Sequence, residues 1–234
     1  MIRILLKEAI GETETRETMR KLFPQLIEML NRFFVGLQNN DYFALTDAVD
    51  LLDILVDIAS DDVNEVSVGG IFNPTYNKIV LKIKIPKTYK DSSLVPKNFK
   101  ELIYKETRST LHHEILHKNQ HSGTKGSLSV SGFKDLTALT DLQKILTPEE
   151  MIKCKQKIFN FFGKHEIEAY ARQAYFDAKK TKQPPFYYLK ERIDVIWFHF
   201  EKLGIDINRI DDLTRLWGSL IEDYYRRYLN KTQL

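Results

Sequence analysis

The spacing of apolar side chains changes in the middle of the sequence, and this change limits what kind of fold the chain can form. In residues 78–85, apolar side chains alternate with lysines, which is the pattern of a strand with one buried and one solvated face. A second strand-like run, residues 65–72, precedes it across the turn-rich spacer 73–77, so the two runs predict a β-hairpin. Because most of the remaining chain shows helical spacing, the sequence predicts an α+β fold that is mostly helical, with a small sheet.

Helical spacing predicts helices on both sides of the hairpin. Two precede it, at residues 13–37 and 42–59, and would form an N-terminal helical pair. A third begins near Asn98, where Asn98 and Glu101 match a capping box, and continues to about His121. A Gly/Ser-rich loop is expected at 122–132, and further helices at 135–146, 147–162, 164–180, 185–203 and 211–229.

These elements suggest three segments along the chain. The helical pair occupies residues 1–62, a metal-binding core occupies 63–180, and a helical extension occupies 181–234.

Composition excludes several classes of protein. The 234 residues include one cysteine, Cys154, so neither a disulfide within the chain nor a zinc ion held by several cysteines is possible. The net charge of +3 is small and the lysines are spread along the chain, which does not favour nucleic-acid binding. The apolar run at the start is too short and too charged for a signal peptide, and no run reaches bilayer length. The sequence therefore favours a cytoplasmic protein without membrane contact.

Residues 113–117 read His-Glu-Ile-Leu-His, an H-E-x-x-H pattern within a predicted helix. Residues i and i+4 lie one above the other on a helix, so the imidazoles of His113 and His117 can reach one zinc ion, each at about 2.0–2.1 Å. Glu114 does not share that face, but it can take a proton from a water that the ion activates. The alternative is a surface helix that carries histidines by chance. Against it, five of the six histidines lie in or near the proposed site segments: His112, His113, His117, His121 and His165.

A catalytic zinc site needs a third protein ligand and one open position. His121 continues the series, but histidines at i, i+4 and i+8 would span roughly 12 Å of helix axis, too far for one ion. We therefore place His112 and His121 around the site or in solvent. The segment 165–171 is the better source, because it carries Glu166 and Glu168 on a second predicted helix. These glutamates are about 200° apart around a helix, so at most one of them should face the ion.

The predicted hairpin, the H-E-x-x-H helix and the segment 165–171 together resemble the minimal gluzincins of the ImmA/IrrE type, over about residues 70–178. In those zincins the second helix reads roughly E-x-E-A, and the glutamate before the alanine is the zinc ligand. The resemblance carries that role to Glu168, with Glu166 as the alternative. It implies a zinc metallopeptidase, a hydrolase that binds one zinc ion, uses Glu114 as general base and cleaves a protein or peptide substrate.

Zincins in general bind the substrate as an added strand along an exposed edge of the small sheet. We expect residues 78–85 to supply that edge, through Lys78, Ile79, Val80, Leu81, Lys82 and Ile83. Candidates for stabilising the oxyanion, or for a place beside the metal ligands, are Tyr170, Tyr175, Arg172, His165 and His121, although such residues more often pack or solvate a helix face.

Three other functions fit the same motif. The chain could be a zincin-fold binding or regulatory protein that retains zinc without robust proteolysis. It could be a virus-encoded structural or host-directed protein, acting in the virion or in the host cytoplasm. A SprT-like protease acting on DNA-bound proteins is the third, but the chain has no cysteine-rich zinc module and no basic tail of the kind that binds DNA.

Overall fold

The computed structural model describes residues 2–39, 47–49, 51–58, 66–90, 95–123, 136–181 and 189–226. The chain forms two compact units, Met1–Leu128 (unit 1) and Ser129–Leu234 (unit 2), where the sequence suggested three segments. The division falls between the H-E-x-x-H helix and the helix that carries Glu166 and Glu168. Most of the predicted Gly/Ser-rich loop, from residue 124 onward, lies outside the described residues.

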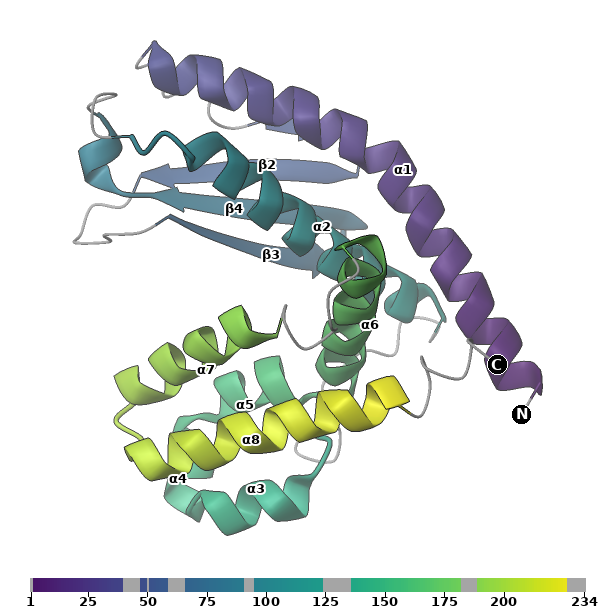
Figure 1. Ribbon diagram of the computed structural model, residues 1–234, viewed down its shortest axis with the longest axis vertical. Helices are drawn as coiled ribbons and strands as arrows, with labels where there is room; N and C mark the ends of the chain where they lie inside the picture. Colours follow the sequence, from purple (N-terminus) through teal and green to yellow (C-terminus); the bar gives the residue numbers. More distant parts are fainter. Residues whose placement is uncertain are drawn as a thin grey trace. The chain divides into compact units, whose positions relative to one another are not determined.

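Unit 1 combines a mixed sheet with two long helices that cover one of its faces (Figure 1). Its elements, in chain order, are α1 (Ile2–Gln38), β1 (Asp47–Val49), β2 (Leu52–Ile58), β3 (Ser67–Asn73), β4 (Lys78–Ile85), the short 3₁₀ helix η2 (Lys87–Lys90) and α2 (Phe99–Gly123). The predicted hairpin of residues 65–85 is confirmed as β3 and β4. Alternate residues of β4, from Ile79 to Ile85, are fully buried against the helices, while Lys82 and Lys84 are exposed.

The prediction of a helix at residues 42–59 is wrong, because β1 and β2 occupy most of its described part. Leu52 and Ile54 are buried in the core, whereas Asp53 is half-buried and Leu55 is 42% exposed. This alternation is the period of a strand rather than of a helix. Among the described residues before β1, α1 is therefore a single long helix and not half of a helical pair.

The prediction that β4 offers an exposed edge is also wrong. The strand order is β1-β2-β4-β3, so β4 lies inside the sheet. It pairs in parallel with β2, from Ile79 to Ile85, and antiparallel with β3, from Lys78 to Lys84. The six residues expected to receive a substrate strand therefore have their backbone groups directed at neighbouring strands: Lys78, Ile79, Val80, Leu81, Lys82 and Ile83. Among the described strands, β1 and β3 lie at the two edges of the sheet, and β3 is the longer of them.

Unit 2 is helical and builds its own core. Its helices are α3 (Leu139–Ile145), α4 (Pro148–Lys153), α5 (Lys155–Phe162), α6 (Lys164–Thr181), α7 (Lys190–Lys202) and α8 (Ile207–Tyr224). Trp217, Phe162 and Phe200 are buried at its centre. The helix predicted at 147–162 is broken at Cys154, where α4 ends and α5 begins. The two units together confirm the α+β, mostly helical class.

Within the parts of the chain that the structure describes, no helix combines the length and the apolar character needed to cross a bilayer.

Candidate metal centre

The H-E-x-x-H residues lie in the second half of α2, a helix held firmly against the sheet. Leu111 and Ile115 are fully buried on its inner side. Nearer its start, Tyr104 donates a hydrogen bond to Asn31 of α1, at 2.7 Å. A helix fixed by packing and by such bonds presents its remaining side chains in defined directions, which a metal site requires.

His113 and His117 converge on α2, as their spacing predicts. Their Nε2 atoms are 2.9 Å apart, and their ring planes are nearly perpendicular, at 88°. His113 is 9% exposed, and His117 is half-buried. Two nitrogens bound to one tetrahedral zinc would lie about 3.3 Å apart, given bonds of about 2.0–2.1 Å. The pair is therefore close to the geometry in which it could hold a metal ion.

Gln120 determines which ring nitrogen of His117 carries the hydrogen. Nδ1 of His117 lies 3.0 Å from Oε1 of Gln120. An amide oxygen can only accept a hydrogen bond, so Nδ1 of His117 carries the hydrogen and donates it. The lone pair of the neutral ring is then on Nε2, the nitrogen that faces His113. Outer hydrogen bonds of this kind fix the tautomer of metal-binding histidines in proteins, so this donor set suits a metal ion.

Glu114 is buried on the side of α2 that faces β3. It is 5% exposed, and Thr110, one turn earlier on the helix, is also 5% exposed. The backbone of Gly70 in β3 passes directly over both side chains, so that a Cβ atom at Gly70 would lie 2.7 Å from Cγ of Glu114. The carboxyl group next in sequence to His113 is thus enclosed between the helix and the edge strand.

The two other histidines of α2 have different surroundings. Burial, followed by the neighbouring His113 and Arg108, lowers the pKa of His112 to about 4, so its ring is neutral at neutral pH. The ring of His121 packs edge-on against Phe72 of β3, with 5.7 Å between ring centroids. His121 therefore contributes to the contact between α2 and the end of β3.

In unit 2, the two glutamates considered as third ligand differ in their contacts. Oε1 of Glu168 accepts a hydrogen bond from Nε of Arg172, at 2.9 Å. Tyr224 of α8 hydrogen-bonds with both of these side chains, and burial, followed by the charge of Glu168, raises the pKa of Tyr224. Glu168 thus belongs to a bridge between α6 and α8. Glu166 lies beside His165 instead, with 3.5 Å between its Oε1 and Nε2 of His165.

The tyrosines proposed as oxyanion helpers pack within unit 2. Tyr170 contacts Trp217 edge-on, with ring centroids 5.3 Å apart, and Tyr175 contacts Tyr225 at 6.1 Å. Both are partly buried against the helical core. These contacts match the simpler expectation for such residues, which is packing on a helix face.

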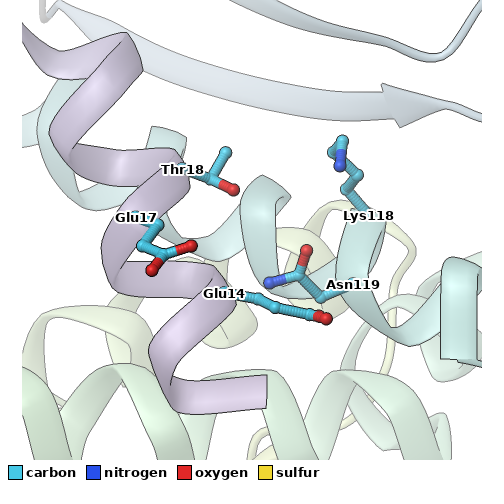
Figure 2. Close-up of a pocket in the computed structure, with 5 residues that line it drawn as sticks. All are labelled: Glu14, Glu17, Thr18, Lys118 and Asn119. Carbon is cyan, nitrogen blue, oxygen red and sulfur yellow. The ribbon is translucent and has the colours of Figure 1, made fainter. Parts of the chain in front are cut away.

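A separate hollow of about 230 Å³ lies between α1 and α2 (Figure 2). Glu14, Glu17 and Thr18 of α1 line it together with Lys118 and Asn119 of α2. Asn119 also donates a hydrogen bond to Thr15, at 2.8 Å, which joins the two helices. None of the three H-E-x-x-H residues is among those that line this hollow.

Reasoning from the sequence missed Gln120, Thr110 and Gly70. The signals for two of them are positions on the helix: Gln120 is one turn after His117, and Thr110 is one turn before Glu114. The signal for Gly70 is a glycine pair inside a predicted strand, which often marks a close approach of backbone to another group.

Comparisons of the chain with protein-family models, with curated proteins and with solved structures give no match.

Proposed function

We propose that this chain is a zinc-dependent peptidase in which His113 and His117 hold the zinc ion and Glu114 is the general base. The observation that carries the proposal is the convergence of the two Nε2 atoms, 2.9 Å apart, on a helix whose adjacent Glu114 is buried against a strand. Gln120 in addition holds the His117 ring in the tautomer that leaves Nε2, the nitrogen facing His113, able to bind a metal ion.

The residues divide the chemistry between them. A bound zinc ion would polarise the scissile carbonyl and lower the pKa of a water to about 7. Glu114 would take the proton from that water and then deliver it to the leaving amine. Its burial beside β3 excludes bulk water around the carboxyl group, which strengthens its interaction with a proton donor. Gln120 keeps the hydrogen of His117 on Nδ1.

For the third ligand we propose a carboxylate of α6. The family resemblance indicates Glu168, but the contacts within unit 2 favour Glu166. Glu168 is already neutralised by Arg172 and hydrogen-bonded by Tyr224, and a metal ion would have to compete with a guanidinium for it. Glu166 lies beside the imidazole of His165, which is a weaker competitor than a guanidinium when it is neutral.

The strand that would receive the substrate is β3 rather than β4. β3 forms an edge of the sheet and lies directly over Glu114, so a peptide added to that edge would lie beside the general base. Two of its residues, Gly69 and Gly70, carry no side chain, and Ile71 is 62% exposed. The backbone groups along this edge can therefore be approached closely.

Metal removal tests the proposal directly. We expect the purified protein to contain about one equivalent of zinc by mass spectrometry and to cleave an unfolded protein substrate. Prolonged chelation should abolish cleavage, and added zinc should restore it. Protein without zinc, or cleavage that survives complete metal removal, would contradict the proposal. One equivalent of zinc with no cleavage of a broad peptide library would favour a binding or regulatory role.

Two matched variants on α6 test the third ligand. We expect Glu166→Gln to weaken zinc binding at least about 10-fold, and Glu168→Gln to change it less, because Glu168 serves the bridge to Arg172. Zinc affinity measured with a competing chelator gives the comparison, and thermal midpoints check the fold. A larger loss in Glu168→Gln would return the ligand role to Glu168, as the resemblance indicates.

A further inference from the structure

Gly70 is the residue of β3 that comes closest to α2. If this residue had a Cβ atom, that atom would lie 2.6 Å from Cγ2 of Thr110, 2.7 Å from Cγ of Glu114 and 3.0 Å from Oε1 of Glu114. Carbon atoms in ordinary contact are at least 3.4 Å apart. Only a glycine therefore allows the strand and the helix to approach this closely at this point.

The neighbouring glycine shows that the requirement is local. A Cβ atom at Gly69 would have no heavy atom within 4 Å, because successive residues of a strand point to opposite faces. Among the described residues only Gly204 is a glycine with positive φ, so Gly70 is not needed for an unusual backbone conformation. What distinguishes Gly70 is the space that its missing side chain leaves for Thr110 and Glu114.

We propose that Gly70 is a positioning residue for the general base. Its missing side chain lets β3 close over α2, and the strand then confines the Glu114 side chain against the helix, next in sequence to His113. This inference rests on the proposed peptidase function, but its steric part can be tested apart from that function. In this role Gly70 acts only through the position of Glu114 and needs no contact with the metal ion.

The two neighbours of Gly70 would respond differently to an added methyl group. Thr110 is β-branched and lies on a helix, so its rotamers are restricted and it resists displacement. Glu114 has a longer, unbranched side chain that can rotate, so it should yield, by about 0.7 Å at Cγ if contact is to become ordinary. A displacement of about 1 Å in a catalytic group can lower the rate about 100-fold.

The decisive variant is Gly70→Ala. We expect kcat for peptide cleavage to fall about 100-fold, KM to change by less than about threefold, and zinc content to stay at one equivalent. Gly218→Ala, in α8 of unit 2, is the kinetic control, because a Cβ atom there also meets nothing within 4 Å. It should keep the kcat of the unmodified protein. Full kcat in Gly70→Ala would overturn the inference.

A second substitution separates positioning from simple loss of stability. Thr110→Ser removes Cγ2, the closest of the clashing atoms, but leaves the clash with Glu114. The double variant Gly70→Ala/Thr110→Ser should therefore recover the thermal midpoint lost in Gly70→Ala while kcat stays low. Recovery of kcat together with the thermal midpoint would mean that Gly70 acts only on packing, and the inference would be wrong.

Crystal structures of Gly70→Ala and Gly69→Ala decide the steric part without any assay of activity. We expect the Glu114 side chain to be displaced in Gly70→Ala and unmoved in Gly69→Ala. An unmoved Glu114 in Gly70→Ala would refute the positioning role. If Glu114 moves as expected but the unmodified protein cleaves nothing, the proposed peptidase function fails while the steric role of Gly70 stands.

Discussion

Substitution of Glu114 by glutamine should leave about one equivalent of zinc bound and lower kcat/KM for peptide cleavage by about 10²–10⁴-fold, the usual contribution of a general base. Glutamine has nearly the same shape, so it occupies the same space under Gly70, but its amide cannot take a proton from water. Zinc content and kinetics, measured on the same preparation, give both quantities.

Glu106→Gln is the matched control, since Glu106 lies on α2 as well and is not among the H-E-x-x-H residues. It should keep both zinc and activity. If Glu114→Gln cleaves peptides as fast as the unmodified protein, another group removes the proton, and the assignment of Glu114 as general base is wrong.

The second large effect concerns the metal itself. We expect His113→Ala and His117→Ala each to reduce bound zinc from about one equivalent to background, because each removes one of the two converging nitrogens. The stabilisation that zinc gives to the folded protein should disappear with it, so the thermal midpoint should no longer rise when zinc is added.

His121→Ala provides the comparison on the same helix. His121 packs against Phe72, so its loss should leave zinc content unchanged. Circular dichroism shows whether each variant is folded, and His117→Gln provides a less disruptive change of the same ligand. Zinc retained at one equivalent in folded His113→Ala and His117→Ala would exclude the pair as the metal site.

The helix that carries His113 and His117 could be predicted because several local signals agree there. The capping residues, the apolar face and the H-E-x-x-H spacing all indicate one helix, and α2 extends from Phe99 to Gly123. The i, i+4 relation of His113 and His117 is a property of any α-helix, so the convergence of their rings needed no knowledge of the rest of the fold.

The secondary structure of the region before the hairpin was harder to predict than that of α2. Its aspartates recur at three- and four-residue intervals, as on a solvated helix face, while Leu52 and Ile54 alternate with Asp53 and Leu55 as in a strand. A short stretch can satisfy both patterns, and only pairing with β4 decides between them.

The position of β4 within the sheet depended on that same choice. Its alternating pattern shows that one face is buried, but it does not show how many strands lie beside it. If residues 52–58 form a helix, β4 has one neighbouring strand and lies at an edge, but residues 52–58 form β2 and β4 lies inside the sheet. The expected position of the exposed edge therefore depended on β2, whereas the convergence of His113 and His117 did not.

The adjacent glycines of β3 have a consequence for which polypeptides such an enzyme would attack. An edge without side chains at two successive positions offers mainly amide and carbonyl groups. The choice of substrate would then depend on whether a polypeptide segment can adopt an extended conformation, and only weakly on its side chains. A native domain keeps its chain within its own ladders and helices, whereas a denatured stretch or a loose tail does not. The same sequence would accordingly be spared when folded and cut when unfolded.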